Sequence, residues 1–236
     1  MQVEHRATKA IIVAAGKGTR LHPLTATTPK PLIEVRGKRM IEGIVESIIS
    51  HGITEIYVVV GYMREKFEYL PAKYAQASIV LLHNPDYDVC NNISSLYAAR
   101  EHLGNCIITD GDLVIRNSDI LNPCFSASGY CSAWAESTGE WLQTVDDDGY
   151  VLQCSRTGGT NGWQLYSVSF WTEKDGAKLR HHIEEAYKGQ GMTDIFWDDV
   201  PMFLYRHEYR LQVRPISHAD IMEIDTLSDL EKSESR

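Results

Sequence analysis

A glycine-containing segment near the start of the chain combines backbone donors with fixed positive charges. It follows the apolar run 10–13, which predicts a buried strand. Its two glycines let the backbone turn sharply and bring N–H groups close to a ligand. Arg20 and Lys30 add two positive charges, and a polyphosphate binds both kinds of donor. The predicted phosphate-binding loop consists of Ala14, Ala15, Gly16, Lys17, Gly18, Thr19 and Arg20.

Two commoner glycine loops do not fit this spacing. A P-loop places its lysine directly after the second glycine of its pattern, whereas Lys17 lies between Gly16 and Gly18. The dinucleotide fingerprint needs a third glycine where Leu21 stands. An ordinary strand-to-helix turn is the plain alternative. The whole pattern, which extends to a Pro-Lys-Pro-Leu sequence at 29–32, favours the phosphate loop.

Acidic residues follow two later apolar runs. Asp110 and Asp112 come after the run 106–109, and Asp225 comes after the run 221–224. Mg²⁺ prefers one or two carboxylates together with phosphate oxygens and water. We therefore expect Asp112 and Asp225 to hold Mg²⁺. The structural alternative, that an aspartate only caps a turn, applies more to Asp110 than to Asp112.

Four of the five tryptophans lie after residue 140, and acids stand beside two of them. An aromatic face with a carboxylate nearby binds a quaternary ammonium group. The flanking acids Glu140 and Asp198 single out Trp141 and Trp197 as cage residues. Core packing is the alternative interpretation for any single tryptophan, and it is strongest for Trp163 and Trp171.

In the first half of the chain, the elements that must position these residues are alternating strands and helices. Strands are expected at 10–13, 55–60, 79–82 and 106–109, and helices at 40–49, near 64–70 and at 94–103. Continuous apolar strands separated by helices predict a parallel sheet covered on both faces. Ligands bind beyond the carboxyl ends of such strands, so the glycine loop and Asp110 are expected to open into one crevice.

The second half of the chain is expected to contain mainly short strands. Short strands are expected at 130–134, 141–145, 151–154, 166–171, 211–216 and 221–224, a loop at 157–162, and helices at 173–187 and 194–204. The predicted fold is therefore α/β: a Rossmann-like mixed, mostly parallel sheet flanked by helices, with a smaller β-rich portion. We expect a single domain over residues 1–236.

The composition of the chain argues against several classes of function. The net charge of −9 argues against a general nucleic-acid or anionic-membrane surface. Five scattered cysteines without C-x-x-C spacing indicate reduced thiols and no zinc site. Residues 1–6 contain no apolar leader and no run approaches membrane-spanning length, so a cytoplasmic protein is expected.

With these residues in place, the chain resembles the bacterial choline-phosphate cytidylyltransferases, within the nucleoside-diphosphate-sugar pyrophosphorylase-like superfamily. The likeness extends from Lys9 to about Leu230. The loop 14–20 and the metal aspartate are shared across that superfamily. The narrower motifs are Asn91-Asn92, Ser95-Leu96-Tyr97, Glu140-Trp141, Val168 to Trp171, Trp197-Asp198 and Glu223 to Asp225.

The resemblance implies a role for each matching residue. Residues 9–115 would form the nucleotide-binding half and residues 116–230 the substrate-binding half of the nucleotide-diphospho-sugar transferase fold. The loop would hold the phosphates of CTP together with Arg20, and Lys30 would contact the α-phosphate. Asp112 and Asp225 would bind Mg²⁺. The base and ribose would be read by Asn91, Asn92 and Ser95, with Asp110 nearby, and the substrate by Trp141, Tyr166, Trp171, Trp197 and Asp198.

The implied reaction joins CTP and phosphocholine to give CDP-choline and pyrophosphate, with Lys30, Arg20 and Asp112 as the catalytic residues. Phosphoethanolamine, 2-aminoethylphosphonate or a sugar 1-phosphate are alternative acceptors, and an inactive nucleotide-binding regulatory module is the alternative outside enzymes. CTP and phosphocholine are the expected partners, with no nucleic acid and no membrane. The sequence is compatible with a homodimer and does not fix the oligomeric state.

Overall fold

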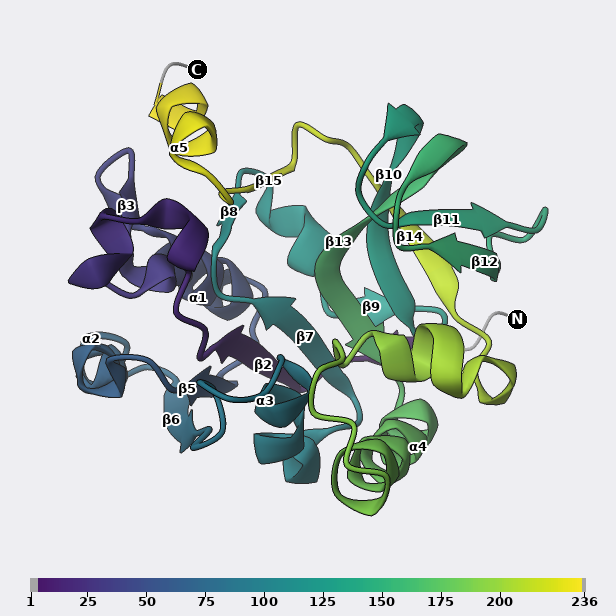
Figure 1. Ribbon diagram of the computed structural model, residues 1–236, viewed down its shortest axis with the longest axis horizontal. Coiled ribbons are helices and arrows are strands. Elements are labelled where there is room, and N and C mark those ends of the chain that lie inside the picture. Colours follow the sequence, from purple (N-terminus) through teal and green to yellow (C-terminus); the bar gives the residue numbers. More distant parts are fainter. Residues whose placement is uncertain (1–3, 235–236) are drawn as a thin grey trace.

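The computed structural model describes residues 4–234, so residues 1–3 and 235–236 of the predicted domain lie outside it. Within that range a nine-stranded mixed sheet organises the molecule, with parallel strands at one end and antiparallel strands at the other (Figure 1). The parallel strands, in sheet order, are β7 (Cys106–Asp110), β2 (Lys9–Ala14), β5 (Glu55–Val60) and β6 (Ser78–His83). Their carboxyl ends therefore meet at one edge.

Strand β2 shows why these strands are continuous apolar runs. Successive side chains of a strand point to opposite faces of the sheet. Ile12 packs in a cluster with the helix α1 (Met40–Ser50), whereas Ile11 packs in a second cluster with α3 (Ile93–Ala98) and α4 (Glu173–Glu184). Both isoleucines have no exposed surface. Two packed faces require apolar residues at every position of the strand.

The antiparallel end of the sheet carries the second half of the chain. The long strand β13 (Gly159–Trp171) joins it to β7, and β10 (Gly129–Thr138) pairs with β13. The hairpin of β11 (Leu142–Val145) and β12 (Val151–Ser155) adds to the other edge of β13, and β14 (Gln212–Ile216) lies parallel to β10.

A small separate pairing determines where the end of the chain lies. Strand β15 (Ile221–Glu223) runs antiparallel to β8 (Leu113–Ile115), and Glu223 stands opposite Leu113. This register brings residues 224–225 beside residues 111–112. The remaining short elements are β1 (His5–Arg6), β3 (Glu34–Val35), β4 (Lys38–Arg39), α2 (Leu70–Lys73), β9 (Cys124–Phe125) and α5 (Leu227–Glu234).

The predicted fold class is confirmed, two local predictions are wrong, and two expected helices are each divided into two short helical segments. Residues 159–162 are not loop but the start of β13, paired with β10. The helix expected at 194–204 is only a π-helical turn at Val200–Leu204. The one expected at 94–103 is α3 followed by a 3₁₀ turn at Arg100–His102, and the one near 64–70 is a 3₁₀ turn at Arg64–Phe67 followed by α2.

Among residues 4–234, no helix has both the length and the apolar composition needed to span a bilayer.

Candidate active site

Two aspartates remote in sequence converge on one ammonium group. The Nζ atom of Lys30 lies 2.5 Å from Oδ2 of Asp112 and 2.8 Å from Oδ1 of Asp225. Arg20 contacts the same Asp225 oxygen at 2.8 Å. The Lys30 side chain is only 9% exposed, and burial favours its neutral form, but the two carboxylates outweigh burial and raise the pKa of Lys30. Lys30 is therefore a fixed cation.

The predicted phosphate loop forms the wall around this group. Gly18 has a φ of +61°, a conformation that glycine adopts without strain. A Cβ on Gly18 would lie 2.7 Å from Cβ of Lys30, so the loop and the lysine are packed as one unit. A cavity of about 300 Å³ opens here; its lining includes Ala14, Gly16, Gly18, Thr19, Arg20, Lys30, Asp112 and Asp225. Ala15 is buried, and Lys17 forms an ion pair with Asp88.

A second cavity of about 230 Å³ adjoins the first and shares Gly16 and Asp112 with it. Its lining includes all of the residues expected to read the base and ribose, Asn91, Asn92 and Ser95, together with Asp110. The side-chain amide of Asn84 donates to Oγ of Ser95 at 3.0 Å, and Asn84 was not predicted from the sequence. The two cavities together have room for a phosphate chain and a nucleoside.

Two further carboxylates, Asp110 and Glu223, lie near Asp112, and Asp110 lines the second cavity. Burial and the charge of Asp112 raise the pKa of Asp110 well above its ordinary value. Burial and the charges of Asp112 and Asp225 raise the pKa of Glu223 to about 7. Glu223 was expected only as part of a motif, and the structure makes it a member of the site. An acidic cleft of this kind favours the binding of cations.

Asp198 differs from its neighbour Asp199 in a way that the sequence could not show. Asp199 is buried and its Oδ1 accepts from Nε of Arg156 at 2.7 Å. In the part of the chain that the structure describes, the buried Oδ1 of Asp198 has no hydrogen-bond partner, and neither has the buried hydroxyl of Tyr130. Burial raises the pKa of Asp198 to about 7. Tyr130 and Asp198 also influence each other's pKa, so they form one buried polar pair beside Trp197.

The structure does not bring the predicted aromatic residues together as an open cage. Trp171 has no exposed surface, Trp197 is 3% exposed, and both pack with Tyr130 in the core. Trp141 lies in another group, edge-on to Phe196 and Phe203. Tyr166 is 7% exposed and its hydroxyl is hydrogen-bonded to Nδ1 of His218 at 2.8 Å. Core packing accounts for Trp171 and Trp197 here.

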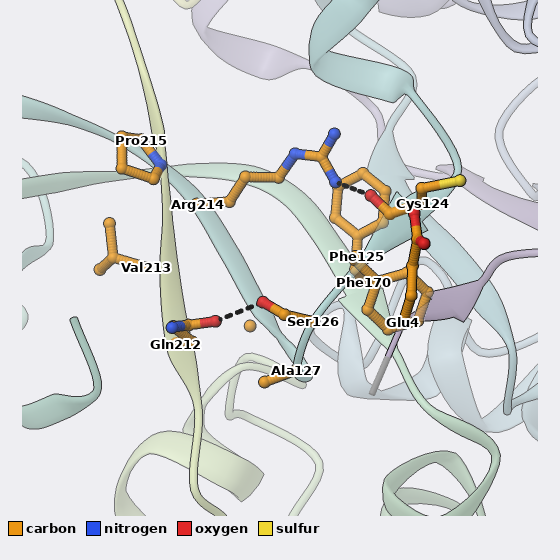
Figure 2. Close-up of a pocket in the computed structure, with 11 residues that line it drawn as sticks. Glu4, Cys124, Phe125, Ser126, Ala127, Phe170, Gln212, Val213, Arg214 and Pro215 are labelled. Atoms are coloured by element: carbon orange, nitrogen blue, oxygen red, sulfur yellow. Dashed lines mark hydrogen bonds between the residues drawn. The ribbon is translucent and has the colours of Figure 1, made fainter. Parts of the chain in front are cut away.

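A larger cavity of about 500 Å³ lies apart from these residues, between β9 and β14 (Figure 2). Arg214 borders it and donates to the carbonyl oxygen of Cys124 at 3.0 Å. None of the residues that line it is a predicted site residue. Its size alone therefore does not make it the active site.

The donor set of the cleft suits Mg²⁺ although it is small. Among residues 4–234 there is no group of three or more His, Cys, Asp or Glu side chains arranged to hold a metal ion. Two aspartates that touch one ammonium supply the hard oxygens and the negative charge that Mg²⁺ takes when phosphates complete its coordination. The residues present therefore fit a magnesium ion shared with a nucleotide.

Comparisons with known proteins agree with this geometry. The nucleotidyl transferase family model matches residues 9–125. A 2-aminoethylphosphonate cytidylyltransferase of Lancefieldella rimae is 39% identical over 94% of this chain and 90% of its own length. The choline-phosphate cytidylyltransferase of Streptococcus pneumoniae is 36% identical over 96% of both chains.

Solved structures of nucleotidyltransferases are also similar to this chain. The CTP:phosphocholine cytidylyltransferase of Streptococcus pneumoniae superposes with a TM-score of 0.89, at 36% identity, over 96% of this chain and 97% of that one. A glucose-1-phosphate thymidylyltransferase of Bacillus anthracis, at 17% identity and a TM-score of 0.76, shares the fold. The chain therefore belongs to the nucleotidyl transferase family, and within it to the group that contains the cytidylyltransferases.

Proposed function

We propose that this protein transfers the cytidylyl group of CTP to a small acceptor with a phosphate or phosphonate at one end and an ammonium group at the other. The observation that carries the reaction class is the contact of Lys30 with both Asp112 and Asp225 beside the glycine loop. The cytidylyltransferase relatives support the choice of CTP. Residues 9–115 would supply most of the nucleotide site and residues 116–230 the acceptor site.

The reaction needs little covalent chemistry from the protein. An anionic oxygen of the acceptor attacks the α-phosphorus of CTP, the bond to the β-phosphate breaks, and pyrophosphate leaves. Because the attacking oxygen is already charged at neutral pH, no general base is required. Positioning and neutralisation of charge then dominate the rate.

Each charged group has a place in this scheme. Lys30 stabilises charge at the α-phosphate, and Arg20 with the loop N–H groups holds the departing pyrophosphate. Asp112 and Asp225 would hold Mg²⁺, which supplies further positive charge to the phosphates. The base and ribose would contact the second cavity, at Asn91 and Ser95.

The acceptor end of the site favours a primary ammonium group. A primary ammonium has N–H donors, and Asp198 has a buried oxygen without a donor. A trimethylammonium group has none, and it needs open aromatic faces that Trp171 and Trp197 do not offer. We therefore propose 2-aminoethylphosphonate or phosphoethanolamine as the acceptor, and the relative named for the first of these supports that choice.

Phosphocholine is the second candidate. Trp141 is only half-buried, so part of its surface can meet a ligand, and a relative of nearly full coverage is named for that acceptor.

A pyrophosphate-release screen tests both proposals. CTP, UTP, dTTP and ATP would each be combined with Mg²⁺ and with 2-aminoethylphosphonate, phosphoethanolamine, phosphocholine or glucose 1-phosphate. We expect release with CTP and a primary-amine acceptor, and Trp141→Ala should leave the KM for that acceptor unchanged. Faster release with phosphocholine, and its selective loss in Trp141→Ala, would establish the aromatic site instead. Release with none of the combinations would contradict the proposed activity.

A further inference from the structure

Three hydrogen bonds join two segments that come from opposite halves of the chain. We call residues 86–92 the asparagine loop and residues 187–199 the acceptor segment. The hydroxyl of Tyr187 donates to Oδ2 of Asp86 at 2.6 Å. The backbone N–H of Asn91 donates to the carbonyl oxygen of Thr193 at 2.7 Å. The amide of Trp197 donates to Oδ1 of Asn92 at 2.8 Å. One segment contains nucleotide-site residues and the other contains Asp198.

The acceptor segment has little regular structure of its own to fix it. It begins within a π-helical turn at Glu185–Gly189 and leads into another at Val200–Leu204, and residues 190–198 form neither helix nor strand. The last residue of the segment, Asp199, is held by two hydrogen bonds. It accepts one from Arg156 and one from the backbone N–H of Phe196, at 2.9 Å. The side chain of Asn92 holds Trp197, the residue directly before Asp198.

The contact with Trp197 limits what else Asn92 can do. One lone pair of its side-chain oxygen already accepts a hydrogen bond from the backbone N–H of Trp197, and this bond fixes the orientation of the amide. Asn91 and Ser95 line the same cavity and can meet the nucleotide directly. Asn92 lines this cavity as well, and of these three residues it is the one whose side chain contacts Trp197 of the acceptor segment.

We propose that Asn92 is a positioning residue that links the two substrate sites, a role that rests on the proposed function. A nucleotide packed against Asn91 and Ser95 orders the asparagine loop. Through Asn92 the loop holds Trp197, and with it the carboxylate of Asp198, in the position that binds the acceptor. Two sites that order one shared element bind their ligands cooperatively without a change of fold.

The test compares Asn92→Ala, which removes the acceptor atom, with Asn92→Asp, which keeps an oxygen facing the Trp197 amide. At saturating CTP, Asn92→Ala should raise the KM for 2-aminoethylphosphonate about tenfold, a common size for coupled sites. Its Kd for CTP, measured without acceptor, should change less than about twofold, because the coupling acts only when both ligands are bound. Asn92→Asp should restore the KM for the acceptor. A Kd for CTP that rises in both variants, with an unaltered KM for the acceptor, would identify Asn92 as a base contact and overturn the proposal.

Hydrogen exchange gives a second readout that needs no acceptor. CTP with Mg²⁺ should slow exchange at residues 190–199 as well as at 86–92 in the wild type and in Asn92→Asp. In Asn92→Ala the protection should be confined to residues 86–92. Equal protection of 190–199 in both variants would refute the link. Tyr187→Phe, which removes another of the three bonds, should weaken the same protection and serves if Asn92→Ala does not fold.

The two readouts also separate this proposal from the proposed function. An enzyme that releases no pyrophosphate with any acceptor would contradict the function, while protection of residues 190–199 by CTP would still support the link.

Discussion

The ammonium of Lys30 is the charge on which the proposed chemistry depends most directly. It is almost buried and lies within hydrogen-bond distance of two carboxylates, so no solvent cation can replace it at the α-phosphate. Replacing Lys30 with Met should lower kcat on the order of 10²–10³-fold, as the loss of one preorganised charge does in other enzymes. Steady-state pyrophosphate release measures this. Lys38→Met, at an exposed lysine paired with Glu46, is the control and should keep normal turnover. Normal turnover in Lys30→Met would refute the mechanism.

The adjacent residues Asp198 and Asp199 should respond in opposite ways to the same substitution. Asp198→Asn should raise the KM for a primary-amine acceptor about 10–100-fold, because a charged hydrogen bond is worth about 1.5–3 kcal/mol. Its stability should fall less than that of Asp199→Asn, since the buried Oδ1 of Asp198 makes no hydrogen bond within residues 4–234. Asp199→Asn should instead lower the free energy of unfolding by about 1–2 kcal/mol, because it weakens the bonds to Arg156. Kinetics and urea unfolding distinguish the two, and equal behaviour would contradict the assignment.

The sequence predicted which charged residues lie together, but it did not predict this distinction. Strand ends and charge predicted that Lys30, Asp112 and Asp225 meet, and the structure places them in contact. The Trp-Asp-Asp sequence at 197–199 does not show which carboxylate is neutralised, because Arg156 lies 43 residues away. The burial of Trp171 likewise depends on Tyr130, Trp197 and Tyr209, which are distant from it in the sequence. Tertiary contacts of this kind leave no local pattern.

At the scale of elements, the glycine loop and the turn that holds Lys30 behave as one packed unit. Gly18→Ala faces both a positive φ and a contact of 2.7 Å with Cβ of Lys30. We expect it to lower the free energy of unfolding by about 1–3 kcal/mol and to displace Lys30. Gly37 is a matched control, with a φ of +77° and no atom within 4 Å of an added Cβ.

The difference between Gly18→Ala and Gly37→Ala therefore isolates the contact with Lys30 from the cost of the backbone conformation. Urea unfolding should show a larger loss for Gly18→Ala, and pyrophosphate release should fall only in that variant. If the two variants match in both stability and activity, the loop does not position Lys30.

Elements with a clear apolar pattern were predictable, and those whose order depends on pairing were not. The central strands β2, β5 and β7 are buried on both faces, so their interiors are mainly apolar, and the edge strand β6 keeps an apolar run although Val80 is exposed. Residues 159–162 contain two glycines and an asparagine and have no such pattern. They become strand because β10 supplies their hydrogen-bond partners, with Thr160 opposite Ser137. Pairing with a neighbour overrides local composition there.

At the scale of the whole molecule, the fold gathers negative charge at the meeting point of its two halves. The β8–β15 pairing brings Glu223 beside Asp112, and the sheet places Asp110 at the same edge. The folded protein therefore holds carboxylates where they repel one another. Substrate phosphates alone would add to that charge, so their binding requires the cations of the cleft. This arrangement makes stability depend on pH and on bound cations.

Glu223 offers the clearest test of that dependence. Burial, with the charges of Asp112 and Asp225, raises the pKa of Glu223 to about 7 in the folded protein, above the value of a free glutamate. The folded state thus binds this proton more tightly than the unfolded state, so the group lowers stability as pH rises from about 4.5 to 7. Glu223→Gln removes that penalty. The variant should equal the wild type near pH 4.5 and exceed it above pH 7 by on the order of 1–3 kcal/mol.

Unfolding in urea between pH 5 and pH 8, without added metal, measures the difference between the two proteins and cancels the contributions of other groups. Glu136→Gln, at an exposed carboxylate on β10, should give no such pH-dependent difference. Mg²⁺ with CTP should reduce the advantage of Glu223→Gln, because positive charge in the cleft relieves the same repulsion. An advantage that is constant across this pH range would show that Glu223 is not ionising within an acidic cleft, and the electrostatic account of the site would fail.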